Sequence, residues 1–525
     1  MTKTKPYFFL SILLLICFGC GKAEIDFPQK PNIIYILADD LGYNELGIYG
    51  QEHIETPHLD ALAQSGMRFS RHYAGSPVCA PSRCVLMTGK HSGHAHIRGN
   101  DEWASRGEVW NFAKAVEDPN LEGQRPIPTG TKTIGNVLQE VGYKTAIVGK
   151  WGLGAPLTEG IPTKKGFDYF FGYNCQRQAH TLYPKHLWEN EEKVWLDNKL
   201  VAPRTKLAEG ANIYADSSYR NYELKEYAPA LMLDRALGFM EQNKEAPFFL
   251  YFASPLPHVP LQAPRKWVDH YRKKFGKEEP YIGNKGYFPC QYPKATYAAM
   301  ISYLDEQIGA MIAKLKELGE YENTLIIFSS DNGPTYVGGA NTPFFESASP
   351  FSTEYGRAKG FVYEGGIRVP MIASWPGVIE ANTQSNHLSA FYDVMPTLCE
   401  ITGAQLPLGT DGQSFLPSLL GKAQTPPEFL YWEFPAYKGQ QAVIMGNWKG
   451  IRQNMAEGNL RLELYNLETD STEKADVAHY HLDIVAQIEE IMAREHLPSE
   501  IERFKFEVFG EGIKKKKKKG KIINH

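Results

Sequence analysis

Runs of consecutive apolar residues alternate along this chain with stretches of helical periodicity. Apolar runs at 32–37, 145–148, 248–253 and 325–328 predict strands buried on both faces, because a strand with one wet face alternates with polar residues. Residues 296–318 keep the helical period and predict a long helix ended by Gly319. Thr56-Pro57 predicts the start of another helix. The alternation predicts an α/β domain around a mainly parallel sheet.

The pattern changes after a stretch rich in Gly and Pro at 406–427. Beyond it, runs at 429–432, 442–445, 448–452 and 462–467 predict a small antiparallel sheet, and 481–495 predicts a helix. We therefore expect a large α/β domain over 24–420 and a smaller C-terminal α+β subdomain over 421–510. A basic tail, 511–525, would follow and holds the lysine run 514–519.

The first 23 residues predict an export segment. Lys3 and Lys5 precede an apolar run at 7–18, which has the length of a signal-peptide core and is short for a membrane span. Gly19-Cys20 resembles a bacterial lipoprotein cleavage site, in which Cys20 would carry the lipid. Ordinary secretion after cleavage at Ala23 is the alternative. We expect an exported protein of the bacterial periplasm or outer membrane, attached to a membrane only through that lipid.

Charge and cysteine content limit the classes of partner and cofactor that the chain could bind. The net charge is −4, so nothing in the overall balance indicates nucleic acid or another polyanion. The lysine run 514–519 is read as a solvated tail, with weak attraction to an anionic polymer or membrane as the alternative. Seven cysteines, two of them in the export segment, lack both metal-site spacing and the density of a disulfide scaffold.

Polar residues suited to chemistry follow each of the four predicted strands. They are Asp39-Asp40, Lys150, His258 and Asp331-Asn332. Ligands of open α/β sheets bind beyond the carboxyl ends of the strands, so we expect these groups to converge on one site. Asp39, Asp40, Asp331 and Asn332 together offer four oxygen donors, the ligands that hard divalent cations prefer.

Cys79-Ala80-Pro81-Ser82-Arg83, followed by Thr88-Gly89, forms the most specific motif of the chain. Pro81 and Ser82 predict a helix start, which would set Cys79 against free N–H groups and the positive end of the helix dipole. The motif resembles the signature of the type I sulfatases, and the resemblance extends over about residues 31–495. It implies an alkaline-phosphatase-like fold and hydrolysis of sulfate esters.

The resemblance also implies residue roles. Cys79 would be oxidised by a maturation enzyme to formylglycine, whose hydrate is the nucleophile. It would join Asp39, Asp40, Asp331 and Asn332 in binding calcium, with magnesium as the alternative. Arg83 would organise the aldehyde hydrate, and Lys150 and Lys359 would hold the sulfate oxygens. His258 would protonate the departing alcohol, and Glu364 and Arg368 are expected to pair with each other.

Gly152 departs from the family pattern, because relatives commonly carry a histidine there that helps to regenerate the aldehyde. We expect His180 to replace it, with substrate contact or a structural role as the alternatives. Two segments, 90–100 and 170–195, are expected to shape the substrate pocket and contribute Arg98, Arg177 and His180. Aromatic residues beside Arg and His suit a sulfated sugar, although packing under a long loop would give the same pattern.

Two other functions stay open on the sequence alone. A phosphatase or phosphonate hydrolase of the same superfamily would share the metal strategy. A surface glycan-binding lipoprotein that has lost catalysis would account for Gly152. Intact Cys79, Arg83 and Lys150 favour the sulfatase over both.

Overall fold

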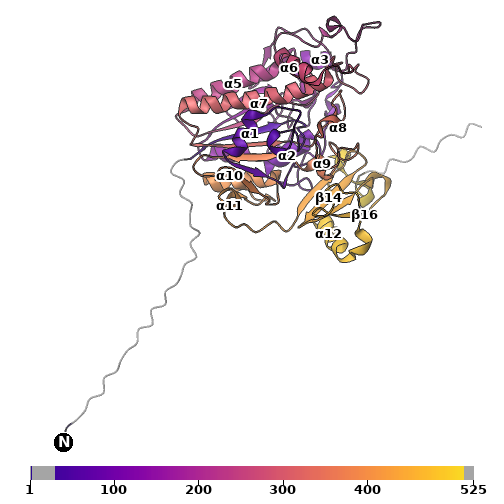
Figure 1. Ribbon diagram of the computed structural model, residues 1–525. Coiled ribbons are helices and arrows are strands. Elements are labelled where there is room, and N and C mark those ends of the chain that lie inside the picture. Colours follow the sequence, from indigo (N-terminus) through magenta and orange to yellow (C-terminus); the bar gives the residue numbers. More distant parts are fainter. Residues whose placement is uncertain (1, 3–29, 513–525) are drawn as a thin grey trace, which may run out of the picture.

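The computed structural model describes residues 30–512, together with Thr2. The export segment with Cys20 and the lysine run 514–519 therefore lie outside the described residues. A large α/β body carries a smaller sheet at one side (Figure 1).

All four predicted strands form and occupy the centre of a ten-stranded sheet. They are β1 (Asn32–Ala38), β4 (Lys144–Lys150), β8 (Phe248–Ala253) and β9 (Thr324–Ser330). The order β9-β1-β8-β4 is parallel throughout, and β5 (Tyr169–Tyr173) extends it in parallel. The remaining strands are β2 (Met67–Phe69), β10 (Met371–Ser374) and β11 (Thr383–Ser385) at one edge and β6 (His186–Glu189) and β7 (Glu192–Trp195) at the other.

Helices cover both faces of this sheet because successive side chains of each central strand point to opposite faces. In β1, Ile33, Tyr35 and Leu37 enter one hydrophobic core, whereas Ile34 and Ile36 enter the other. The first core holds α2 (Cys79–Thr88), α4 (Ile134–Glu140) and α10 (Val394–Thr402). The second holds α1 (Pro57–Gln64), α5 (Ala228–Gln242), α6 (Arg265–Phe275) and α7 (Pro293–Leu318) (Figure 1). Shorter elements are β3 (His72–Tyr73), α3 (Phe112–Glu117), α8 (Thr342–Phe345), α9 (Glu364–Ile367), α11 (Leu416–Leu419) and β12 (Ser389–Ala390).

Helices α7 and α1 form where the sequence predicts helices, with one difference in a cap. Helix α7 ends at Gly319, which adopts φ 75° and so closes the helix in the left-handed region. Helix α1 begins at Pro57 after Thr56, as expected. The Thr56 hydroxyl nevertheless makes no capping bond: it accepts from the N–H of Gly47 and donates to Asp60.

The C-terminal part forms the predicted antiparallel sheet, with strands β13 (Leu430–Phe434), β14 (Gln440–Met445), β15 (Trp448–Arg452) and β16 (Leu462–Asn466). Helix α12 (Leu482–Arg494) packs on one face through Ile488 and Met492. The opposite face belongs to the core of the large domain, where the Trp432 indole N–H donates to the carbonyl of Ala74 at 2.8 Å. The small sheet is thus fused to the large domain, and the boundary at 420 stays a prediction.

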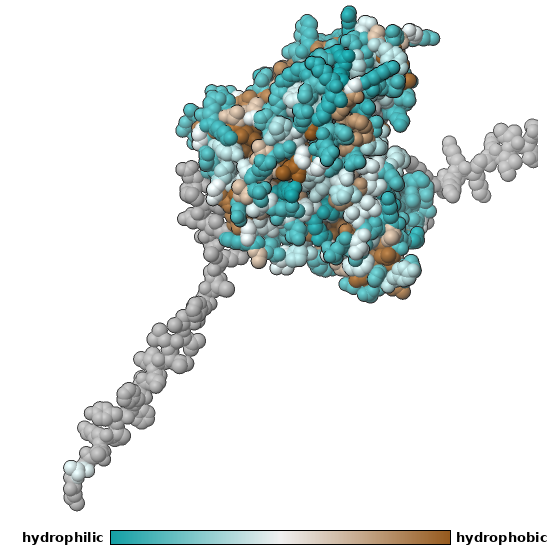
Figure 2. Space-filling model, in the orientation of Figure 1, coloured by the Kyte–Doolittle hydropathy of each residue, from teal (hydrophilic) through white to brown (hydrophobic). Residues whose placement is uncertain are grey.

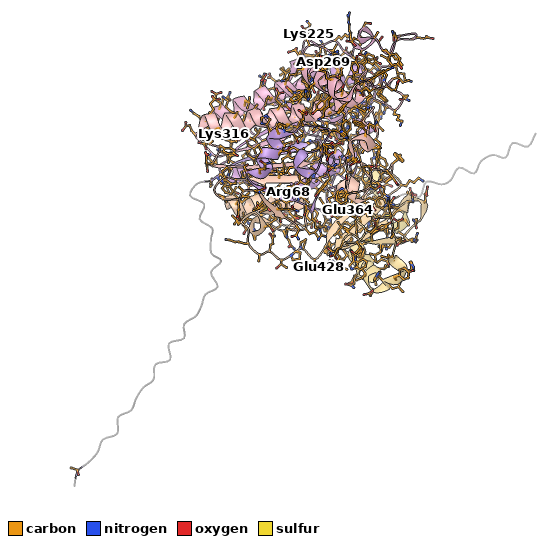
Figure 3. All side chains as sticks on the ribbon, in the orientation of Figure 1. Arg68, Lys225, Asp269, Lys316, Glu364 and Glu428 are labelled. Atoms are coloured by element: carbon orange, nitrogen blue, oxygen red, sulfur yellow. The ribbon has the colours of Figure 1, made fainter. Side chains whose placement is uncertain are left out.

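Buried charges also join the two parts. Lys449 in β15 donates to Glu364 at 2.8 Å and lies 2.9 Å from Glu473, and all three side chains are buried. Glu364 also pairs with Arg368 at 2.9 Å, which confirms the predicted pair. Figure 3 labels Glu364 at the junction between the large domain and the small sheet.

The outer surface is ordinary for a globular protein. Figure 2 shows a mostly hydrophilic face on which apolar residues are scattered or in small groups. Within residues 30–512, no helix has the length and apolar character needed to cross a bilayer.

Candidate active site

The carboxyl ends of the central strands bring the predicted polar groups together. Asp39 and Asp40 follow β1, and Asp331 follows β9 beside it. The side chain of Asp331 accepts the backbone N–H of Asp40 at 3.1 Å, which holds Asp40 at the strained φ of 68°. Asn332 donates to Asp40 at 2.8 Å. Four oxygen-bearing side chains from two neighbouring parallel strands therefore share one buried spot.

Cys79 is the first residue of α2, so the predicted start at Pro81-Ser82 is two residues late. Val78 is the cap residue, and the Ser82 hydroxyl accepts from the N–H of Gly75 instead of capping the helix. The Cys79 thiol is buried and donates to Asp39 at 3.3 Å. Burial and the charge of Asp39 raise the pKa of the Cys79 thiol well above its usual value. An unmodified Cys79 is therefore a protonated thiol with little nucleophilic character.

Arg83 lies one turn along α2 from Cys79 and binds two of the strands. Its Nε and Nη2 donate to the same oxygen of Asp331 at 3.0 and 2.8 Å, and its Nη1 donates to the carbonyl of Lys150 at 2.6 Å. The guanidinium is fully buried. Arg83 thus fixes the distance between the signature helix and the sheet, and it supplies one positive charge to the carboxylates.

Two lysines each bind one carboxylate of the cluster. Lys150, the last residue of β4, donates to Asp39 at 2.6 Å. Lys359 donates to both oxygens of Asp40 at 2.5 and 2.6 Å and lies 3.7 Å from the sulfur of Cys79. Both ammonium groups are within reach of an anion placed beside Cys79.

His258 and His180 complete the inner wall. The Nδ1 of His258 lies 2.5 Å from the carbonyl of Val259, so Nδ1 carries the proton and Nε2 faces Asp40 at 3.6 Å. The ring of His180 stacks on that of His258 with centroids 5.6 Å apart. Burial lowers the pKa of His258 to about 4 and that of His180 well below its usual value.

The acidic groups of the cluster are unequally stabilised. Burial alone would raise the pKa of Asp39, but the charges of Lys150, His258 and Arg83 hold it well below its usual value. Burial and the neighbouring Asp39 raise the pKa of Asp331 to about 7. The negative charge of Asp331 is therefore not fully balanced by the positive charge of Arg83, which binds it.

These residues fit a divalent cation. The Oδ1 of Asn332 is buried and has no hydrogen-bond partner among residues 30–512. It lies beside carboxylates whose charges are incompletely balanced, and oxygen donors of this kind are those that hard cations bind. Asp39, Asp40, Cys79 and His258 also place ligand atoms within 4.8 Å of one another. Asp39, Asp40, Asp331 and Asn332 are the residues that would hold such a cation.

A hollow of about 380 Å³ opens beside the carboxylate cluster, and its floor is made of groups that contact those carboxylates. Its inner lining includes Cys79, Lys150, His180, His258 and Lys359. A row of aromatic rings from both parts of the chain lines the outer region, with neighbouring centroids 5.4 to 6.1 Å apart: Tyr336, Tyr355, Phe361, Tyr437 and Phe434. The small sheet thus supplies part of the active-site wall.

Three further residues, His180, Arg177 and Arg98, were predicted to bind substrate, and the structure places them differently. His180 lines the hollow. The guanidinium of Arg177 donates to the carbonyl of Trp110 at 2.7 Å and lies over its ring. Arg98 is buried and bonds to Glu433 and to the carbonyl of Leu497. It therefore joins the loop after α2 to the small sheet and does not line the hollow, contrary to the prediction.

Gly152 adopts φ 79°, and a Cβ built there would approach the side chain of Gln176 to 3.0 Å. Gln176 therefore occupies the space beside Gly152, and it lines the hollow as well. Sequence analysis did not single out Gln176, because the contact joins segments that are distant in the sequence. His180 packs against His258.

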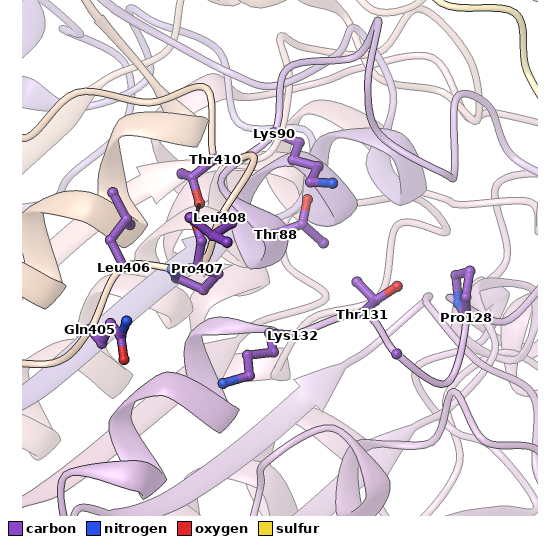
Figure 4. A pocket seen from close by; sticks show the side chains of 11 residues that line it. Thr88, Lys90, Pro128, Thr131, Lys132, Gln405, Leu406, Pro407, Leu408 and Thr410 are labelled. Atoms are coloured by element: carbon purple, nitrogen blue, oxygen red, sulfur yellow. Dashed lines mark hydrogen bonds between the residues drawn. The ribbon is translucent and has the colours of Figure 1, made fainter.

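A second, larger hollow of about 510 Å³ lies at the other end of α2 (Figure 4). Thr88 ends α2 there, about 14 Å of helix rise away from Cys79. Of the described residues that line it, Lys90 and Lys132 alone carry charge. Chemistry, not size, therefore identifies the hollow at Cys79 as the candidate active site.

A nucleophile position at a helix N-terminus, a buried cluster of oxygen donors that fits a cation and two lysines around one hollow form the arrangement of a hydrolase for anionic esters. The Sulfatase family profile matches residues 31–404, and a profile described as N-sulphoglucosamine sulphohydrolase, C-terminal, matches residues 354–497. The chain belongs to the sulfatase family, within the alkaline phosphatase superfamily, and is a sulfuric ester hydrolase.

Named relatives extend over most of the chain. It is 30% identical to N-acetylgalactosamine-6-sulfatase of Canis lupus familiaris over 455 residues, which cover 83% of this chain and 74% of that protein. It is 29% identical to N-acetylgalactosamine-6-O-sulfatase of Bacteroides thetaiotaomicron over 522 residues, covering 88% and 93%. The crystal structure of Ps i-CgsB superposes with a TM-score of 0.69 at 27% identity, covering 89% of this chain and 94% of that chain.

Proposed function

We propose that this protein hydrolyses sulfate esters of a carbohydrate, with a formylglycine made from Cys79 and a bound calcium ion. The observation that carries the proposal is the position of Cys79, which starts α2 with its sulfur 3.3 Å from Asp39 and 3.7 Å from Lys359. A sulfuryl group held at this point would face the nucleophile position and both lysines at once.

Oxidised to formylglycine, Cys79 supplies an aldehyde hydrate, with one hydroxyl to attack sulfur and a second whose deprotonation lets sulfate leave. A calcium ion on Asp39, Asp40, Asp331 and Asn332 would polarise oxygen atoms at the same point. With the carboxylates so engaged, Lys150 and Lys359 are free to bind the sulfuryl oxygens and stabilise the charge that develops on them. Arg83 holds Asp331 and the end of β4 in place.

His258 is the group placed to protonate the departing alcohol. Its Nδ1 proton is held by the Val259 carbonyl, so the proton that it gives to the alcohol would be taken up on Nε2, the ring atom 3.6 Å from Asp40. Burial first, and then Lys359, keep the pKa of His258 low while the site holds no substrate. A bound sulfate ester brings negative charge beside the ring, which raises its pKa and favours the protonated form.

The identity of the nucleophile is tested by mass spectrometry of the peptide that contains Cys79, from protein exported by its natural host. Formylglycine replaces one sulfur and two hydrogen atoms by one oxygen, and this change is the expected result. An intact thiol in fully matured protein would contradict the proposed mechanism. Rates on sulfate and phosphate esters of the same alcohol then separate a sulfatase from a phosphoester hydrolase of the superfamily.

His258→Gln should slow hydrolysis most where the leaving group is poor. We expect about a 10²- to 10⁴-fold loss of kcat on an alkyl or sugar sulfate, because the alcohol must depart without a proton donor. On 4-nitrophenyl sulfate, whose phenolate leaves readily, the loss should be at least tenfold smaller. His270→Gln, at an exposed histidine that pairs with Glu55, is the control. Equal losses on both esters would exclude His258 as the proton donor.

Removing the cation should abolish activity and lower Tm. Without it, Asp39, Asp40 and Asp331 remain crowded in a buried cluster, and the Oδ1 of Asn332 stays unsatisfied. Protein dialysed against a chelator is assayed for metal content, melting temperature and activity, then titrated with Ca²⁺ or Mg²⁺. We expect activity and Tm to recover at a lower concentration of Ca²⁺ than of Mg²⁺. Full activity in protein shown to be free of metal would contradict the cation assignment.

The carbohydrate part of the proposal rests on the relatives and on the aromatic lining. The names of the mammalian and bacterial relatives specify N-acetylgalactosamine 6-sulfate, and a solved structure of Ps i-CgsB contains k-i-k-neocarrahexaose. Tyr355 and Tyr437 at the mouth of the hollow are 80% and 54% exposed, as rings that stack on sugars must be. An export segment ending at Cys20 would place such an enzyme where polymeric glycans are found.

A further inference from the structure

One wall of the active-site hollow carries two hydrogen-bond acceptors that the protein leaves unsatisfied. The Oε2 of Glu102 and the Oε1 of Gln176 are buried, and neither has a partner among residues 30–512. Both residues line the hollow. A buried acceptor without a donor is costly, so their position indicates a ligand that brings donors to this wall.

The orientation of Gln176 is fixed by a chain of bonds that begins at the signature helix. The backbone N–H of Ala80 donates to the side chain of Asn100 at 3.2 Å, so the atom it meets must be the oxygen Oδ1. The same Oδ1 accepts from Gln176 at 3.1 Å, so the atom that Gln176 presents there must be Nε2. The remaining atom, Oε1, is therefore an acceptor whose direction is set.

Glu102 lies two residues beyond Asn100, on the same wall. The charged groups that influence it are Arg177, Lys150 and Arg503, which favour its ionised form, and Asp101, which opposes it. Burial raises its pKa to about 7, so it is partly or fully ionised at neutral pH and above. Within the described chain, Arg177 uses a guanidinium N–H on the Trp110 carbonyl and forms no ion pair with Glu102 within 4.0 Å.

The floor and the wall therefore make opposite demands on a ligand. Lys150, Lys359 and His258 at the floor offer positive charge to an anion. Glu102 and Gln176 on the wall offer acceptors, and the acceptor of Glu102 is a carboxylate when that residue is ionised. A ligand that satisfies both carries a sulfate at one carbon and free hydroxyl or amide N–H groups on the carbons beside it.

We propose that Glu102 and Gln176 form a sugar-hydroxyl subsite that selects a monosulfated sugar residue and rejects one with a second sulfate or a carboxylate beside the first. This inference rests on the proposed function. Carbohydrate hydroxyls are donors of the required kind, and a hydrogen bond to a carboxylate is stronger than one to a neutral group. A second anionic group at this wall would meet the charge of Glu102.

The test compares Glu102→Ala with the wild-type enzyme on two classes of substrate, a monosulfated monosaccharide and 4-nitrophenyl sulfate, which has no hydroxyl groups. The ratio of kcat/KM for the sugar to kcat/KM for the aryl ester should fall about 10- to 100-fold. Glu102→Gln keeps an acceptor of the same shape and should recover part of that ratio. It should also gain on a disulfated sugar relative to the wild type.

A deoxy analogue of the sugar locates the interaction on the substrate. Removing the hydroxyl that meets Glu102 should lower kcat/KM of the wild type by a similar factor but have little further effect on Glu102→Ala. Glu108→Ala serves as the matched control, because Glu108 lies six residues further along the same loop in an exposed pair with Lys114. An unchanged substrate ratio in Glu102→Ala would overturn the subsite.

A binding measurement separates this inference from the proposed reaction. Calorimetry with Cys79→Ala, with and without Glu102→Ala, reports affinity for the monosulfated sugar when no turnover occurs. Absence of hydrolysis by matured wild-type protein would contradict the sulfatase reaction alone. Equal affinities in the two proteins would contradict the subsite alone, whereas a 10- to 100-fold weaker affinity with Glu102→Ala would support it.

Discussion

Cys79→Ala should abolish sulfate-ester hydrolysis, with a loss of about 10⁴-fold or more in kcat, while the protein keeps its fold. The thiol is buried beside Asp39, and burial raises the pKa of Cys79, so even the unmodified cysteine cannot replace the modified residue. Cys79 belongs to neither hydrophobic core of the described chain, and Asp39 remains bonded to Lys150. Rates on 4-nitrophenyl sulfate and the melting temperature measure the two parts of this prediction.

Cys84→Ala is the matched control for this change. Cys84 lies in the same helix, is equally buried and belongs to the hydrophobic core rather than to the hollow. Its replacement should lower Tm slightly and leave kcat within about twofold. If Cys79→Ala retained a tenth of wild-type activity, the nucleophile would have to be another group. A comparable loss in Cys84→Ala would show that the helix, not the thiol position, matters.

Lys449→Ala should destabilise the protein by about 3–5 kcal/mol, the largest effect we expect outside the active site. Lys449 is the cation that Glu364 and Glu473 share in a buried network. Burial would raise the pKa of Glu364, but Lys449 and Arg368 lower it to about 2, whereas burial raises that of Glu473 to about 7. Without Lys449, two buried carboxyl groups face each other. Thermal melting and protease susceptibility of the small sheet measure the outcome.

Lys438→Ala provides the contrast, because Lys438 and Glu457 form a salt bridge between side chains that are 61% and 58% exposed. Its effect should stay within about 0.5 kcal/mol. Lys449→Ala combined with Glu473→Gln should recover part of the lost stability, since Glu364 keeps its pair with Arg368 and the other buried acid is then neutral. A Lys449→Ala protein as stable as Lys438→Ala would show that water or rearrangement replaces the lysine.

The central strands could be predicted from the sequence because burial on both faces leaves a continuous apolar run, as in β1 and β8. The same logic predicted that Asp39, Lys150 and Asp331 would meet, since parallel strands share their carboxyl edge. Strand β11 at the edge of the sheet and its neighbour β2 have only three residues each, too few to give a recognisable apolar run. The start of α2 was misplaced because Ser82 bonds to Gly75 instead of capping the helix.

The outer part of the hollow could not be predicted in the same way. Residues 170–195 contain the aromatic and basic residues expected there, yet His186 and Trp188 bond to the buried Glu122. The rings that line the mouth come instead from residues 336–361 and from the small sheet. Local composition does not reveal which loops a fold brings together. Gln176 was missed for the same reason, because only the packing beside Gly152 places it in the hollow.

Because the small sheet supplies part of the hollow, substrate range and reaction chemistry can change independently during evolution. Cys79, Lys150 and His258 belong to the large domain, whereas Phe434 and Tyr437 lie at the turn between β13 and β14. That turn can lengthen, shorten or exchange its rings without moving any atom that contacts the sulfuryl group. A lineage of such enzymes could therefore acquire new glycans through a single hairpin while inheriting an unaltered reaction centre, and directed evolution of substrate range should begin there.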